Sequence, residues 1–239
     1  MIESLQKPPK NLGLITEESL TNHTYMRTGG RASFFAEPKN LSNLPLIIEW
    51  AHSKKLPVKI IGAGSNLLIS DSGLNEVVVS LKRACREINF SKQHVSVGAG
   101  VMLPALSRAA ANVDLGGLEF VIGIPGTVGG ALCNNSGIGD GRNFGSLVEE
   151  VTILKESKIS KISHSELQFN YRSSNIKNLD VIILSTVLNL EFRAKIECEL
   201  EMRRLLEARQ KTQPTSSRNA GSMFKNPLNQ YAGELIEKA

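Results

Sequence analysis

The sequence predicts an α+β fold, because strand-like and helical patterns alternate along its 239 residues. Runs of β-branched and aliphatic residues, of which residues 181–190 are the richest, have the composition of buried strands. Apolar residues at positions i, i+3, i+4 and i+7, counted from Leu44, predict a helix over residues 42–54. The length is sufficient to bury a substantial core.

The same patterns predict the remaining strands and helices. Strands are expected at residues 32–36, 58–61, 77–81, 95–97, 148–154 and 181–190. Further helices are expected at residues 103–113, at 194–211 and from about 231 onward. These elements suggest three parts: residues 1–82, residues 83–193 and residues 194–239.

Composition excludes several classes of function. The net charge of +5 is scattered along the chain, which argues against a nucleic-acid partner. The three cysteines are far apart, so neither a disulfide framework nor a metal site is expected. The first residues lack the apolar core of a signal peptide, and residues 181–190 are too short to span a bilayer. We expect a cytoplasmic protein without a membrane partner, and no protein partner can be identified.

A first glycine-rich segment follows the strand expected at residues 58–61. Glycines at the end of a strand let backbone N–H groups approach a phosphate, and short polar side chains add donors. The segment lacks the lysine of a Walker loop and the third glycine of a Rossmann fingerprint. A tight turn without a ligand is an equally open interpretation. The candidate cofactor-binding residues are Gly62, Ala63, Gly64, Ser65, Asn66 and Leu67.

A second segment, residues 123–130, has four glycines in eight positions. Such a stretch can surround a diphosphate with main-chain donors while Ile124 and Val128 anchor it in the core. The two segments together predict a dinucleotide cofactor held outside a Rossmann scaffold. The candidate residues here are Gly123, Ile124, Pro125, Gly126, Thr127, Gly129 and Gly130.

A third segment, residues 221–227, combines glycines, a hydroxyl, an ammonium and an amide with a turn-forming proline. This mixture is a poor core segment and suits a polar ligand held beside a proton-transfer group. With no other information, Ser222 is equally readable as a turn serine.

Five motifs in order carry a resemblance to a known family; they occupy residues 25–30, 61–68, 123–130, 170–174 and 219–227. From about residue 22 to its end, the chain resembles MurB, the UDP-N-acetylenolpyruvoylglucosamine reductase family. Residues 171–181 run almost directly into the next strand, so the chain resembles the branch with the shorter substrate loop. The resemblance implies a two-part FAD-binding fold of the vanillyl-alcohol-oxidase (PCMH) type, followed by an α+β substrate-binding domain.

The resemblance also implies an activity: NADPH reduces a non-covalently bound FAD, which then reduces UDP-N-acetylglucosamine enolpyruvate to UDP-N-acetylmuramate. It implies that the glycine-rich segments contact FAD, that Arg172 stabilises the intermediate and that Ser222 protonates it. Tyr171, Lys211 and Asn226 match positions for the UDP-sugar. From the residues alone, a surface arginine is the favoured interpretation of Arg172. The position of Lys211 likewise favours a residue that stabilises the end of its helix.

Family members continue beyond the position that matches Ala239, with strands, a helix and a catalytic glutamate. The substrate-binding domain is therefore expected to be incomplete and the activity impaired. The alternatives are a FAD-binding protein without turnover and another oxidoreductase on the same flavin scaffold. Ser222 and its neighbours favour the reductase over the last of these.

Overall fold

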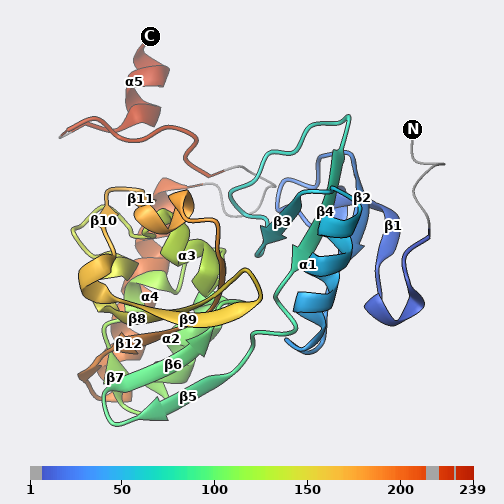
Figure 1. Ribbon diagram of the computed structural model, residues 1–239. Helices are drawn as coiled ribbons and strands as arrows, with labels where there is room; N and C mark the ends of the chain where they lie inside the picture. Colours follow the sequence, from blue (N-terminus) through green and yellow to red (C-terminus); the bar gives the residue numbers. More distant parts are fainter. Residues whose placement is uncertain (1–6, 214–220, 229) are drawn as a thin grey trace.

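The computed structural model describes residues 7–213, 221–228 and 230–239, and it consists of two lobes with a short C-terminal segment beside them (Figure 1). The first lobe contains β1–β4 and α1, and the second contains β5–β13 and α2–α4. The strands of the first lobe are β1 (Ile15–Ser19), β2 (Arg31–Ala36), β3 (Val58–Ile61) and β4 (Leu74–Ser80). The helices are α1 (Asn43–Ser53), α2 (Leu103–Ala111), α3 (Val128–Asn134), α4 (Lys195–Thr212) and α5 (Ala232–Lys238).

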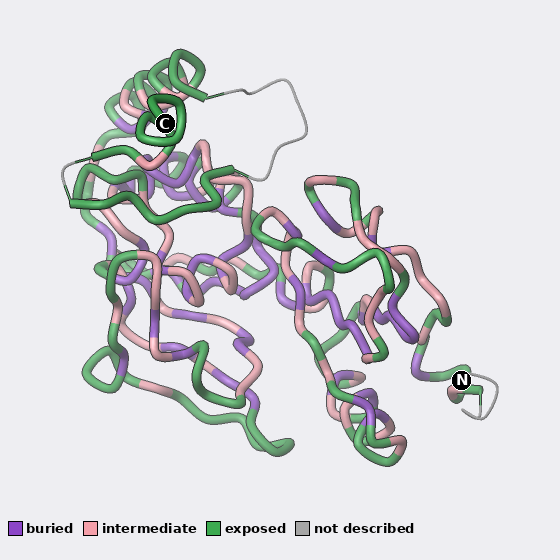
Figure 2. Tube along the Cα trace, turned by 90° about the horizontal axis from the view of Figure 1, so that it is seen from above, coloured by how far each residue is buried: buried purple, intermediate pink, exposed green. Residues whose placement is uncertain are grey.

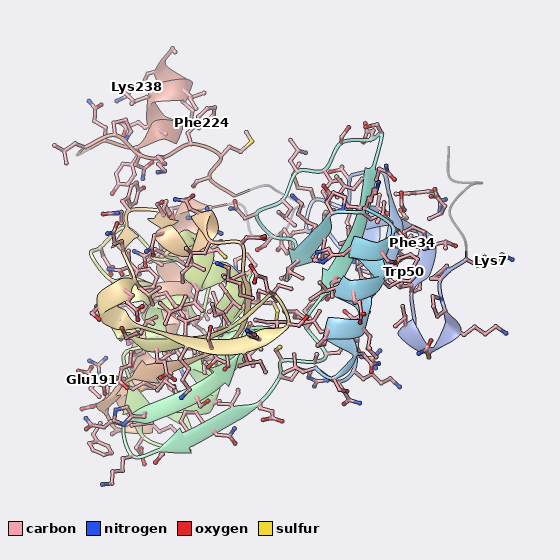
Figure 3. The ribbon with its side chains drawn as sticks, viewed as in Figure 1. Lys7, Phe34, Trp50, Glu191, Phe224 and Lys238 are labelled. Carbon is pink, nitrogen blue, oxygen red and sulfur yellow. The ribbon has the colours of Figure 1, made fainter. Side chains whose placement is uncertain are left out.

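The first lobe is a four-stranded sheet in the order β1-β2-β4-β3. Strands β2, β4 and β3 are parallel and β1 is antiparallel, so α1 serves as the crossover between β2 and β3. Both faces of β2 are buried, as expected for a strand inside a parallel sheet. On the face covered by α1, Phe34 meets the ring of Trp50 edge-on at 4.8 Å between centroids (Figure 3).

The second lobe is an antiparallel sheet in the order β5-β6-β12-β8-β9. The β-branched strand β12 lies at its centre, paired with β6 and β8. Small two-stranded pairs, β10 with β11 and β13 with β7, complete the lobe. Its strands are β5 (Ile88–Ser91), β6 (His94–Gly98), β7 (Leu115–Gly116), β8 (Val148–Lys155), β9 (Lys158–Ser163), β10 (Phe169–Asn170), β11 (Ser173–Ser174), β12 (Ile182–Asn189) and β13 (Glu191–Phe192).

One continuous core joins the two lobes. Leu81, Ala99 and Val101 belong to the same cluster of buried side chains as Val77 in the first lobe and Leu188 in the second. Figure 2 shows buried stretches inside both lobes, whereas the C-terminal segment is exposed. None of the described helices is long and apolar enough to cross a bilayer.

Helix α4 packs on the second lobe through a narrow apolar stripe. Cys198 and Met202 are buried against Ala111 and Ile122, and the rest of the helix is largely polar. On its outer side Glu201 accepts hydrogen bonds from Arg204 and from Arg142 of the loop before β8. The helix is thereby held with its last turn beside residue 123.

Most expected elements are confirmed to within a few residues at each end. The helix expected at residues 103–113 ends at Ala111. One expectation is wrong: residues 128–130 are not loop but the first turn of α3, because Thr127 provides an N-terminal cap. Strands β1, β5, β9, β10, β11, β7 and β13 were not expected.

Candidate functional site

The first glycine loop, residues 62–68, leaves β3 at the boundary between the two lobes. A Cβ on Gly62 would lie 2.4 Å from Oγ1 of Thr127, so only glycine permits this approach to the second lobe. The Ser65 hydroxyl lies 3.6 Å from the position that a Cβ on Gly126 would occupy. The structure therefore brings together the two glycine-rich segments, which the sequence separates by about sixty residues.

Residues 22–30 form the other wall of the first glycine loop. The Tyr25 N–H donates to the Gly64 carbonyl oxygen at 3.1 Å. A Cβ on Gly64 would lie 2.0 Å from the carbonyl oxygen of His23, and the φ of Gly64 is +69°. Both the close approach and the left-handed backbone require glycine at this position.

Several backbone N–H groups of the first glycine loop are unpaired among the described residues. Within the described part of the chain, the N–H groups of residues 63–67 have no hydrogen-bond acceptor. Buried or half-buried backbone donors are normally paired, and successive unpaired N–H groups form a concave site for anions. The loop thus has free main-chain donors available to a phosphate group.

The second glycine loop, residues 123–130, contributes fewer donors than its sequence suggests. The Gly129 N–H donates to the Ala99 carbonyl at 2.9 Å, and the Gly130 N–H donates to Oγ1 of Thr127 at 3.4 Å. The N–H groups of Gly123, Gly126 and Thr127 have no acceptor among the described residues. The main-chain donors available to a diphosphate therefore lie in the loop before α3 and not in the first turn of α3.

The anchoring role expected for Ile124 and Val128 is confirmed. Val128 is fully buried, and Ile124 packs against the core. Pro125 lies between Ile124 and the free N–H of Gly126 and carries no donor of its own. This half of the site is consequently rigid, since its backbone is fixed both by packing and by the cap at Thr127.

Arg209, which sequence reasoning missed, lies against the second glycine loop. Its Cδ is 3.1 Å and its Nη1 3.7 Å from the position that a Cβ on Gly123 would occupy. Burial lowers the pKa of the Arg209 guanidinium, and the electrostatic interaction with Tyr25 opposes this shift. The one feature of the sequence that could have indicated this contact is Gly123, whose missing side chain leaves room for a long side chain from another element.

Arg172 and Tyr171 form the turn between β10 and β11. Arg172 has a φ of +55°, and its guanidinium carbon lies 5.6 Å from the centre of the Tyr171 ring. This cation–π contact orients the arginine on a two-residue turn. No carboxylate partner of Arg172 occurs in the described residues, so its charge is available to an anionic ligand.

The C-terminal segment approaches this turn at one point. The backbone N–H of Asn226 donates to the Tyr171 hydroxyl at 3.4 Å. The side-chain oxygen of Asn226 accepts from the N–H of Ala232, so it is occupied by the start of α5. Asn226 therefore reaches the predicted substrate-binding region through its backbone, while its side chain stabilises the next helix.

Ser222 and Lys211 form no hydrogen bond or ion pair with the other candidates in the described part of the chain. All of residues 221–228 are exposed, and neither side chain makes a hydrogen bond within the described part of the chain. Lys211 lies in the last turn of α4, where a cation also favours the helix end. Asn219 and Ala220, which begin the last motif, lie outside the described residues.

Comparison with known proteins gives consistent results. A family model described as "FAD binding domain" matches residues 32–156. A UDP-N-acetylenolpyruvoylglucosamine reductase 2 from Symbiobacterium thermophilum is 37% identical over 241 aligned positions, which cover 100% of this chain and 78% of that protein.

Solved structures agree on the architecture. The UDP-N-acetylenolpyruvylglucosamine reductase (MurB) of Thermus caldophilus superposes with a TM-score of 0.77 at 32% identity, covering 94% of this chain and 78% of that one. The 6-hydroxy-D-nicotine oxidase of Arthrobacter nicotinovorans has a TM-score of 0.58 at 17% identity, over 75% of this chain and 42% of its own. The oxidase shares the fold alone. The FAD-binding family model and the MurB structure, together with this shared fold, confirm the two-part flavin-binding architecture of the vanillyl-alcohol-oxidase type.

Proposed function

Because the chain belongs to the UDP-N-acetylenolpyruvoylglucosamine reductase family, we propose that it is an FAD-dependent enzyme of peptidoglycan synthesis. It uses NADPH to reduce the enolpyruvyl group of UDP-N-acetylglucosamine enolpyruvate, which gives UDP-N-acetylmuramate. We place this reaction in the cytoplasm, where NADPH and the nucleotide sugar are made.

The meeting of the two glycine loops is the observation that carries the proposal. Gly62 and Thr127 approach so closely that a methyl group has no room between them, and unpaired N–H groups lie on both sides of the contact. Four of the cofactor-binding residues predicted from the sequence, Gly62, Ser65, Gly126 and Thr127, meet at this point. The residues present therefore fit the diphosphate of FAD.

FAD, held by the two glycine loops through their free N–H groups, would supply hydride-transfer chemistry between NADPH and the substrate double bond. Addition of that hydride leaves negative charge on the substrate, next to its carboxylate. Arg172 carries a fixed charge with two parallel donors, and the Tyr171 ring orients it. We assign Arg172 the role of binding this developing charge.

Completion of the reduction also requires a proton at the neighbouring carbon. We assign the donation to Ser222, whose hydroxyl is free of other partners in the described residues. An ordinary serine is a weak acid, so the bound substrate or cofactor must stabilise its conjugate base. Ser222 must approach Arg172 in the loaded enzyme, and the Asn226–Tyr171 hydrogen bond already holds its segment beside the same turn.

The substrate contacts and the domain limits follow from the same arrangement. We propose that Tyr171, Lys211 and the backbone of Asn226 bind the nucleotide sugar on the side of β10 and β11. We propose FAD-binding parts over residues 1–82 and 83–193, with residues 194–239 belonging to the substrate-binding part. The two separate sheets support the first division.

One observation favours a second candidate, an FAD-binding protein that does not complete the reduction. Residues 221–228 are exposed throughout, and the Ser222 side chain forms no hydrogen bond with Arg172 or any other described residue. The test is NADPH consumption by the FAD-loaded chain, with and without UDP-N-acetylglucosamine enolpyruvate.

Consumption that depends on the enolpyruvyl sugar would establish the reductase. Bound FAD that NADPH reduces, with no dependence on the sugar, would support the second candidate. Turnover with another electron acceptor or donor, and none with the sugar, would place the chain among the other oxidoreductases of this fold.

A further inference from the structure

Arg209 is a half-buried cation without an anionic partner. Two other arginines around α4 are paired: Arg193 contacts Glu119 at 3.3 Å, and Arg204 contacts Glu201 at 2.7 Å. Arg209 has no carboxylate partner and no side-chain hydrogen bond within the described residues. Burying a cation without a counter-charge is unfavourable, so this arrangement costs stability unless a ligand supplies the charge.

The position of Arg209 indicates what that ligand is. Its side chain rests on Gly123, at the start of a loop whose N–H groups at Gly123, Gly126 and Thr127 are unpaired in the described structure. Tyr25 of the first lobe, whose N–H donates to the carbonyl oxygen of Gly64 in the first glycine loop, is near enough to Arg209 to affect the pKa of its guanidinium. Arg209 therefore rests directly on the second glycine loop, on the side of the first lobe.

We infer that Arg209 binds a phosphate oxygen of a nucleotide diphosphate held between the two glycine loops. This inference rests on the proposed function, which supplies two such diphosphates, that of FAD and that of the UDP-sugar. A guanidinium matches a phosphate with two parallel hydrogen bonds and keeps its charge even when partly buried.

Gly123 contributes to the placement of the Arg209 side chain. Its missing side chain lets the Arg209 methylenes lie against the loop backbone, with Leu206 alongside at 3.7 Å from the Cβ position. Packing of the stem leaves the guanidinium at the loop with few alternative rotamers. Arg209 is consequently positioned before the ligand arrives.

The experiment measures binding rather than turnover. Apoprotein is titrated with FAD and with riboflavin by the change in flavin fluorescence, and with UDP by calorimetry, for the wild type, Arg209→Gln and Arg209→Lys. Arg203→Gln is the matched control, because Arg203 belongs to the same helix, is exposed and has no ion pair in the described part. Thermal unfolding of each apoprotein shows whether it is folded.

We expect Arg209→Gln to weaken either FAD or UDP by about 10- to 100-fold, the range for a lost charged hydrogen bond. Loss confined to FAD assigns the residue to the cofactor diphosphate, and loss confined to UDP assigns it to the sugar nucleotide. Riboflavin, which has no phosphate, binds with unchanged affinity, and Arg203→Gln stays within about twofold. Arg209→Lys loses several-fold, because it keeps the charge but not the paired donors.

Several results would overturn the inference. These are unchanged affinity of Arg209→Gln for both FAD and UDP, an equal loss for riboflavin, and an equal loss in Arg203→Gln. If Arg209→Gln does not fold, wild-type affinity of Arg209→Lys for both nucleotides overturns it, as does a wild type that binds neither. The proposed function fails separately: a wild type that binds FAD without sugar-dependent NADPH consumption refutes the reductase and leaves the role of Arg209 intact.

Discussion

The two halves of the candidate site differ in how deeply they are buried and in how firmly contacts with the rest of the protein hold them. The half that fits the cofactor is embedded in the core, where Thr127 is 2% exposed and Val128 is fully buried. The half that carries the predicted chemistry lies on the surface, where Phe224 is 61% exposed (Figure 3) and the Asn226 N–H donates a hydrogen bond to the Tyr171 hydroxyl. In the cofactor half, two loops fix one another; in the other half, this hydrogen bond links a turn to an exposed, irregular segment.

This difference separates binding from catalysis in a way that mutations can test. Changes at the glycine loops disrupt the fold's internal contacts and displace the main-chain phosphate donors, so stability and cofactor binding fall together. Changes at Arg172 or Ser222 leave the core untouched, so only the chemical step falls. The predictions below follow this division, from the largest expected effect to the smallest.

The largest effect is expected from Arg172→Gln. Loss of the charge that matches the reduced substrate lowers the rate of the sugar-reducing half-reaction by about 100- to 1000-fold, as for other lost oxyanion-binding donors. Reduction of FAD by NADPH, followed separately in a stopped-flow instrument, keeps its rate. Ser222→Ala is expected to show the same separation of the two half-reactions, and equal losses in both would mean that these residues are structural.

In the cofactor half, Gly64→Ala combines two penalties. The new methyl group would lie 2.0 Å from the His23 carbonyl oxygen, at a φ of +69°. The free energy of unfolding is expected to fall by about 3 kcal/mol, measured by urea denaturation, with loss of FAD binding.

Gly139→Ala is the matched control for Gly64→Ala. Gly139 also has a positive φ, +88°, but has nothing within 4 Å of its Cβ position. It should lose only the backbone part, about 1 kcal/mol, and keep FAD binding. Equal losses in the two variants would mean that the contact between the first glycine loop and residue 23 contributes nothing.

The sequence predicted the cofactor half better than the substrate half, for physical reasons. Closely approaching backbones require glycine, so the high glycine content of residues 62–64 and 123–130 can be recognised in a single sequence. The role of Arg209 could not be recognised in this way, because it depends on α4 packing against a loop more than eighty residues earlier in the chain.

Errors in the predicted elements have equally specific causes. Helix α3 was missed because Gly129 and Gly130 are poor helix formers, although Thr127 caps the first turn. Strand β9 was missed because it is an exposed edge strand whose lysines and serines outnumber its isoleucines. β-Branched and leucine content, in contrast, predicted a strand at residues 181–190, and the structure places that strand, β12, at the centre of its sheet.

A smaller effect is expected from Thr127→Val. The substitution keeps the shape of the side chain but removes the Oγ1 atom that accepts from the Gly130 N–H at the start of α3. Loss of such a cap costs about 1 kcal/mol in the free energy of unfolding, measured by urea denaturation. Thr127→Ser retains the hydroxyl and should retain most of the stability; an equal loss in both variants would assign the effect to packing of the methyl group.

The smallest effect concerns the ion pairs that hold α4. Hydrogen bonds from Arg204, opposed by partial burial and assisted by Arg142, lower the pKa of Glu201 from 4.5 to about 2. The folded state therefore holds the ionised form more strongly than the unfolded chain does. This stabilisation is complete above about pH 4.5 and is lost as the pH falls through about 2.

Glu201→Gln removes this contribution. Because Arg204 is 62% exposed, the loss at neutral pH is expected to be at most about 1 kcal/mol, and the variant should converge with the wild type in strong acid. Urea denaturation at neutral pH and near pH 2 tests this. A constant difference between the two proteins at all pH values would show that the ionised carboxylate contributes nothing.

The central claim is that the two glycine loops form one FAD site at the boundary of the lobes. Titration of the apoprotein with FAD, followed by flavin fluorescence, tests it most directly when the wild type is compared with Gly62→Val, whose side chain would occupy the space of the Thr127 hydroxyl. The account predicts saturation of the wild type at about one FAD per chain, as expected for a single such site, and loss of binding in a folded Gly62→Val. Equal binding by the two proteins, or none by the wild type, would contradict it.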